Sequence, residues 1–297
     1  MLQRHRPELM LVVCTVIWGG TFPAVKYALE FSSAWLIVAM RFAIAGILFE
    51  LIFRNAGQKI NRLIFLRGVI LGLFFFAGFG LQTLGLQYTS SSRSAFLTEA
   101  LVIIIPVLSF VMSRKRPSLF TMTGAVFVMA GLYLLTSPAG FVDFNRGDWL
   151  TLGCALSFSF YIIGVDLWST PESRGLLSTV QAFTVALLAT PMAFCEGVRL
   201  QPAGGFILAM LYLILPGTIA VVMLQMRYQP QSTPARAGVI FALEPVFAML
   251  YAVVLSFEGF AWRAVLGALV VTGGVVWSEL GTSVWRGVLA RVRSAGK

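Results

Sequence analysis

Residues 93–112 read RSAFLTEALVIIIPVLSFVM, and residues 236–255, which lie 143 positions later, read RAGVIFALEPVFAMLYAVVL. Each stretch begins with an arginine and holds one acidic residue, Glu99 or Glu244, in an otherwise apolar run. An apolar run of about 20 residues is long enough to cross the hydrocarbon core of a bilayer as a helix. The two stretches therefore predict membrane-spanning helices, and their fixed spacing predicts an internal repeat.

The rest of the chain has the same character. Of its 297 residues, 58% are hydrophobic and only 11% are charged, which would leave large apolar patches exposed on a soluble domain. The predicted fold class is an all-α integral membrane protein with ten transmembrane helices and short connections. The apolar runs that predict these helices lie near residues 8–29, 33–53, 67–88, 93–112, 118–136, 147–168, 175–195, 204–226, 235–256 and 262–282.

The basic residues predict the orientation, because lysine and arginine are enriched in cytoplasmic loops. With a cytoplasmic N-terminus, the inner segments hold most of them, including Arg54, Lys59 and residues 114–116. The outer segments then hold Arg146, Arg199 and Arg263. We therefore expect both termini to be cytoplasmic and the chain to lie in the cell (inner) membrane. The net charge of +10 is then explained by contacts to anionic lipid head groups rather than to nucleic acid.

The internal repeat predicts how the helices are related. The offset of 143 residues also aligns Gln82 with Gln225, Arg93 with Arg236 and Gly131 with Gly274, and an offset of 140 aligns Glu8 with Asp148. We predict a first five-helix repeat over residues 1–139, a second over residues 140–285 and a basic cytoplasmic tail over residues 286–297. Because five is odd, the second repeat must be inverted relative to the first, an arrangement typical of carriers with alternating access.

Several kinds of chemistry have no support in the sequence. The three cysteines lack the CxxC spacing of a metal site, the only histidine is His5 in the N-terminal tail, and no GxxxxGK[ST] loop is present. We therefore predict no catalytic residue, no metal and no cofactor. A membrane-embedded enzyme acting on lipid-linked substrates is the less favoured alternative, because it would need acids, histidines or metal ligands clustered at one interface.

Residues 18–26, WGGTFPAVK, resemble the WG-x-x-F-x-x-x-K signature of EamA-type transporters in the drug/metabolite transporter superfamily. Arg41-Phe42, residues 88–92 and residues 242–247 follow in the order of that family's motifs. The resemblance covers nearly the whole chain. It implies ten helices, cytoplasmic termini, a central cavity between the halves, and export or exchange of small metabolites, commonly amino acids or drug-like compounds.

Ionisable residues inside the predicted spans are the first candidates for function. Glu99 and Glu244 lie well inside their helices, where a carboxylate is costly unless it is protonated, paired or facing water. The alternative is a structural pair, for instance with Arg41. For Arg41, near the middle of the second helix, we favour a structural brace over contact with a substrate carboxylate. Lys26 either faces the cavity or extends to the membrane interface along its aliphatic stem.

Other polar, aromatic and small residues complete the candidate set. Gln82 and Gln225 occupy equivalent positions and need hydrogen-bond partners if they are buried. Aromatic rings can stack on an apolar solute or attract a cation, although most of the 25 phenylalanines must pack against helices or lipid. The aromatic candidates for the cavity are Trp18, Phe22, Phe79, Phe158 and Tyr161. Gly124, Gly131, Gly267 and Gly274 predict close helix packing, within one monomer or between two.

These features together predict a carrier whose halves rock about a midplane cavity formed by the first, third, fourth, sixth, eighth and ninth helices. Its expected partners are membrane lipids and a small amphipathic substrate, with an amino acid as the first choice. A nucleotide-sugar carrier or a drug efflux carrier of the same superfamily is the alternative. Proton coupling through Glu99 or Glu244 and uncoupled facilitated diffusion both stay open, as do a monomer and a weak homodimer.

Overall fold

The computed structural model describes residues 5–53, 61–113, 117–136, 144–201, 203–254 and 262–295. The part described is almost entirely helical, with a single isolated bridge between Ser32 and Leu200. Several basic residues that support the predicted orientation lie outside the described residues, namely Arg4, Arg54, Lys59, Arg114, Lys115, Arg116 and Lys297.

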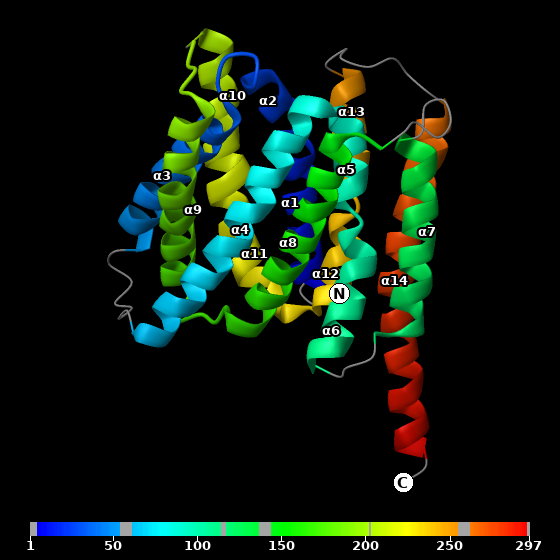
Figure 1. Cartoon of the computed structure of the whole chain (residues 1–297). Coiled ribbons are helices and arrows are strands. Elements are labelled where there is room, and N and C mark those ends of the chain that lie inside the picture. Colours follow the sequence, from blue (N-terminus) through cyan, green and yellow to red (C-terminus); the bar gives the residue numbers. More distant parts are fainter. Residues whose placement is uncertain are drawn as a thin grey trace.

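The helices follow the predicted runs closely (Figure 1). The first half contains α1 (Arg6–Gly19), α2 (Thr21–Ala28), α3 (Ala34–Phe53), α4 (Arg62–Tyr88), α5 (Ser91–Thr98), α6 (Leu101–Ser113) and α7 (Leu119–Thr136). The second half contains α8 (Arg146–Trp168), α9 (Arg174–Glu196), α10 (Gly204–Ile214), α11 (Val221–Tyr228), α12 (Pro234–Phe241), α13 (Glu244–Val254) and α14 (Trp262–Ala295).

Eight of the helical segments are long and apolar enough to cross a membrane, and two shorter apolar helices, Leu119–Leu135 and Trp262–Ser278, bring the described total to the ten that the sequence predicts. The N- and C-terminal ends lie on the same side of the bundle (Figure 1). The last helix, α14, continues through most of the predicted basic tail as far as Ala295 and projects below the bundle, while residues 296 and 297 lie outside the described residues.

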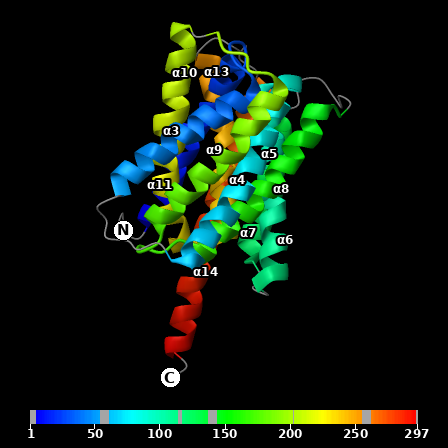
Figure 2. The ribbon, with the colours of Figure 1, turned by 60° about the vertical axis from the view of Figure 1, so that its left-hand side comes forward.

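Neighbouring helices from the two halves pack against each other in opposite directions. The start of α3 meets the end of α9, where Glu196 Oε2 accepts a hydrogen bond from the Trp35 backbone N–H at 2.9 Å. Figure 2 shows α3, α9 and α4 crossing side by side. Along α4 and α8 the direction is again opposite, since Gly85 approaches Gly147 at one end and Leu71 approaches Gly164 at the other.

The fifth and tenth spans, α7 and α14, form an antiparallel pair at one edge of the bundle (Figure 1). A Cβ atom added to Gly131 would lie 2.6 Å from the Val271 backbone nitrogen, and one added to Gly124 would lie 2.8 Å from the Gly274 carbonyl oxygen. Gly267 in turn packs against the backbone of Leu135. The four glycines named from the sequence therefore meet within one chain, where small residues let two backbones approach closely.

The fourth and ninth spans are each interrupted, although the sequence predicts two continuous helices. Glu99 and Ala100 form a turn between α5 and α6, and Ala242 and Leu243 form a turn between α12 and α13. The offset of 143 residues places the second turn directly on the first. Broken helices are tolerated at membrane depth only where protein or a cavity surrounds the freed backbone groups, so equivalent breaks in the two halves point to the centre of function.

Two further interruptions lie in the first and eighth spans. Gly20 separates α1 from α2, and the hydroxyl of Tyr212 donates to the nearby carbonyl of Ile17 at 2.6 Å. A π-helical segment, Leu215–Ala220, joins α10 to α11. Inserted π turns leave backbone groups without their regular helical partners, and they are frequent at functional sites.

We expect Gly131→Ala to destabilise the α7–α14 pair, because the added methyl group would collide with the Val271 backbone, and overpacking of this kind costs about 1–3 kcal/mol. The matched control is Gly273→Ala, since nothing lies within 4 Å of a Cβ added at Gly273. Thermal unfolding of the purified variants in detergent should show a melting temperature several degrees lower for Gly131→Ala only. Equal melting temperatures for the two variants would contradict the packing described here.

Candidate functional site

A cavity lies between the two halves, and the space not filled by atoms there, open solvent included, is about 460 Å³. It is lined by residues of the first, third, fourth, sixth, eighth and ninth spans, the six spans named from the sequence. The lining residues are Trp18, Thr21, Phe75, Phe79, Gln82, Thr98 and Leu101 of the first half and Phe158, Tyr161, Ile162, Gln225, Phe241 and Glu244 of the second.

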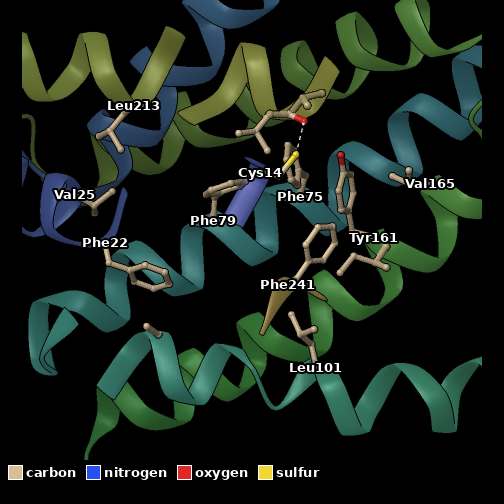
Figure 3. Close-up of a cluster of buried hydrophobic side chains, with 14 of the residues drawn as sticks. Cys14, Phe22, Val25, Phe75, Phe79, Leu101, Tyr161, Val165, Leu213 and Phe241 are labelled. Atoms are coloured by element: carbon tan, nitrogen blue, oxygen red, sulfur yellow. Dashed lines mark hydrogen bonds between the residues drawn. The ribbon is translucent and has the colours of Figure 1, made fainter. Parts of the chain in front are cut away.

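Six of the thirteen lining residues are aromatic. The Phe75 and Tyr161 rings stack with their centroids 4.2 Å apart, and the Phe79 and Phe158 rings meet edge to face at 5.1 Å. Figure 3 shows Phe75, Phe79, Tyr161 and Phe241 gathered in one region of the buried core. These rings therefore contact one another across the boundary between the halves and give the cavity a largely apolar wall.

The two glutamates lie at the helix breaks. Glu244 begins α13 and faces the cavity. Glu99 follows the last residue of α5 and is 1% exposed, and neither of its carboxyl oxygens has a hydrogen-bond partner among the described residues. It does not itself line the cavity, but its neighbour Thr98 does, and Glu99 is close enough to Glu244 to interact with it electrostatically. Glu99 thus holds an unpartnered carboxyl group beside the cavity, while Glu244 also interacts electrostatically with Arg41.

The two glutamines are both at the cavity, in unequal surroundings. Gln82 Nε2 donates to Thr98 Oγ1 at 3.4 Å. Gln225 Nε2 donates to Gln229 Oε1 at 2.8 Å, and its own Oε1 has no partner among the described residues. A buried amide oxygen without a partner is costly, so the Gln225 oxygen is available to accept a hydrogen bond from a bound solute.

Arg41 is buried outside the cavity wall and forms hydrogen bonds from the first half to the second. Its Nε donates to Thr218 Oγ1 at 2.5 Å and its Nη2 donates to the Gly217 carbonyl at 2.9 Å, both within the π-helical segment. Its guanidinium carbon lies 4.5 Å from the centroid of the Phe79 ring. The hydrogen-bond partners of Arg41 are therefore in the eighth span, and its charge also interacts with Glu244. The contact with the Phe79 ring connects Arg41 to the cavity wall.

Lys26 and Phe22, two other candidates, also lie away from the cavity. Lys26 Nζ donates to the carbonyl oxygens of Leu86 and Thr89 at 2.5 and 3.0 Å, which places a cation on the C-terminal carbonyls of α4. Phe22 is buried in the surrounding core. Of the nine cavity candidates named from the sequence, seven line the cavity, and Phe22 and Glu99 do not.

Sequence reasoning missed six lining residues, namely Thr21, Phe75, Thr98, Leu101, Ile162 and Phe241. Two of them carry a usable signal. Phe75 stands one helical turn before Phe79 on the same face of α4, and Thr98 is adjacent to Glu99. Leu101, Ile162 and Phe241 are apolar residues in apolar helices, so periodicity does not distinguish them from side chains that face lipid.

Comparison with known proteins agrees with this architecture. Residues 5–137 and 145–279 each match the model of the EamA-like transporter family. An uncharacterized transporter of Archaeoglobus fulgidus is 30% identical over 93% of this chain and 86% of its own length. An uncharacterized inner membrane transporter of Salmonella typhimurium, YicL, is 23% identical over 92% of this chain and 94% of its own length.

The fold also matches a solved structure. One crystal structure superposes with a TM-score of 0.78 and 19% sequence identity, covering 93% of this chain and 98% of that one. Two family matches, one in each half, together span most of the sequence, and the family is one of transporters rather than enzymes. The chain therefore belongs to the EamA-like transporter family.

Proposed function

We propose that this chain is a carrier of the cell (inner) membrane that exports or exchanges an amino acid or a similar amphipathic metabolite by alternating access. In this proposal the two five-helix halves are an inverted repeat, both termini are cytoplasmic, and the cavity between the halves is the substrate site. The observation that carries it is the aromatic cavity at the boundary of the halves, with two glutamates at equivalent helix breaks beside it.

The chemistry of the cavity favours an amine-bearing solute. A carboxylate in a site of low water content gains strongly from a charge-assisted hydrogen bond to an ammonium group, and aromatic faces also attract cations. Glu244 supplies the acid in the cavity wall, with Glu99 buried near it, and Trp18, Phe79 and Tyr161 supply aromatic rings for an apolar side chain. None of the described lining residues is lysine or arginine, so the cavity is poorly matched to the phosphates of a nucleotide sugar.

A second candidate function is efflux of aromatic amines, which share the same two recognition elements. An amino acid differs from such a compound by its carboxylate, for which the Gln82 and Gln225 amides and the Thr21 and Thr98 hydroxyls are the available partners. Binding measurements with matched compounds therefore separate the two functions. An amino acid and its decarboxylated amine form the most direct pair.

We expect a thermal-shift screen of the purified protein against amino acids and their decarboxylated amines to identify ligands that raise the melting temperature, since binding to the folded state stabilises it by mass action. Ligands found in this way should show saturable counterflow in proteoliposomes. Stabilisation only by phosphorylated sugars, or linear and unsaturable uptake, would contradict the proposal.

We expect Glu244→Gln to weaken binding of an amine-bearing ligand by about tenfold or more, because it removes the charge from a hydrogen bond between the cavity carboxylate and the ammonium group. The control is Glu50→Gln, which changes an exposed carboxylate on α3. Uptake with and without a pH gradient, measured on both variants, tests proton coupling. If Glu244→Gln binds and transports like the parent protein, Glu244 has neither role.

A further inference from the structure

Two ion pairs connect the halves at opposite faces of the molecule. Arg93 Nη2 of the first half lies 2.7 Å from Asp148 Oδ2 of the second. Arg236 Nη2 of the second half lies 3.3 Å from Glu8 Oε1 of the first. Each pair thus joins one half to the other, and neither takes part in the cavity described above.

The two pairs are related by the internal repeat. The offset of 143 residues places Arg236 on Arg93, and the offset of 140 places Asp148 on Glu8. In the structure all four are the third residue of a helix: Arg93 in α5, Arg236 in α12, Glu8 in α1 and Asp148 in α8.

Even the local helix caps of the two arginines correspond. The hydroxyl of Ser90 accepts from the Arg93 backbone N–H at 3.2 Å, and the hydroxyl of Thr233 accepts from the Arg236 backbone N–H at 3.3 Å. One interaction is therefore built twice, once by each half.

Counting membrane crossings places the pairs on opposite faces. Glu8 precedes the first crossing and Arg236 follows the eighth, so both lie on the face where α1 begins, called here the N-terminal face. Arg93 follows the third crossing and Asp148 follows the fifth, so both lie on the opposite face. In the orientation proposed above, these faces are cytoplasmic and extracytoplasmic, respectively.

The helices that carry the ion pairs also line the cavity. Trp18 of α1, Thr98 of α5, Phe158 of α8 and Phe241 of α12 are all lining residues. Each pair therefore holds together, at one face, two helices that come from different halves and continue to the cavity. We propose that the two ion pairs are the gates of this carrier, and that separating one pair opens the cavity to its own face while the other stays closed.

Simple electrostatics favours charged groups in this role. An arginine in the first turn of a helix faces the positive end of the helix dipole, and the acidic partner offsets that unfavourable contact. When the gate opens, water enters and solvates both separated charges. Hydration of the separated charges thus offsets the lost attraction of the ion pair. The open and closed states of a gate therefore differ by a small free energy, which a carrier that alternates between them requires.

The two gates are not equally strong in this structure. Asp148 is fully buried and also accepts from the Asn145 backbone N–H at 2.8 Å and from the Thr89 hydroxyl at 3.3 Å. For Glu8, Oε2 has no partner among the described residues, and the preceding N-cap residue, His5, makes no side-chain cap bond. The gate at the N-terminal face is the weaker one, and we infer that it opens more readily in the absence of substrate.

The inference rests on the proposed carrier function but is tested without measuring transport. A single cysteine replaces Gln82 in the cavity, in a chain whose three native cysteines are changed to alanine, and the protein is placed in liposomes of known orientation. The labelling rate with a membrane-impermeant maleimide is measured from each face. Arg93→Gln and Asp148→Asn open one gate; Arg236→Gln and Glu8→Gln open the other.

We expect each variant to raise labelling from its own face by roughly fivefold or more and to lower it from the other face, because the two open states compete. The double variant Arg236→Glu with Glu8→Arg should return labelling toward the parent rate, because it restores an ion pair between the same two positions. Since each gate has two members, a variant that does not fold is replaced by the variant of its partner.

The gate proposal is wrong if variants of both ion pairs change the labelling rate from the same face. It is also wrong if folded variants show the labelling rate of the parent protein. The outcome is distinguishable from failure of the proposed function. If labelling changes as expected but uptake is not saturable, the gate proposal stands and the proposed carrier function is wrong. If uptake is saturable but labelling does not change, only the gate proposal is wrong.

Discussion

Water is absent from the hydrocarbon core of a bilayer, so every backbone N–H and carbonyl group there must find its partner within the protein. This constraint accounts for the architecture of the chain, in which the described spans are helices whose regular hydrogen bonds satisfy the backbone. It also limits where a helix can be interrupted. The breaks at residues 99–100 and 242–243 and the π-helical segment 215–220 lie in spans that line the cavity, surrounded by other helices.

Each interruption brings a polar side chain with it. Arg41 satisfies the carbonyl of Gly217 in the π-helical segment, and Tyr212 satisfies the carbonyl of Ile17 beside the break in the first span. At the paired breaks of the fourth and ninth spans, the polar groups are Glu99 and Glu244, and the carboxyl group of Glu99 has no hydrogen-bond partner among the described residues. A carrier needs such an imbalance, because a solute can contribute binding energy only where the protein has not already satisfied its own groups.

The two halves contribute in corresponding ways to packing and in different ways to the cavity. Glycines pair α7 with α14, and the two ion pairs repeat one contact at the two faces. In contrast, Phe75 and Phe79 of α4 stack against Tyr161 and Phe158 of α8, helices that do not occupy equivalent positions in their repeats. Repetition therefore supplies the framework, while the substrate would meet a wall that is asymmetric.

From the sequence alone one can predict the ten spans, the repeated halves, the transporter family and seven of the thirteen lining residues, because length, hydropathy and motif order are local properties of the chain. Glu99 and Glu244 can be named as candidates from the sequence because each is an acidic residue inside a long apolar run. The tertiary structure decided what these properties leave open. Only the structure shows that the fourth and ninth helices are interrupted, that Arg41 binds the π-helical segment, and that Arg93 pairs with Asp148. The reason is that an apolar helix in a membrane has no polar face to define its inward side, so only packing against the other helices determines which side chains meet.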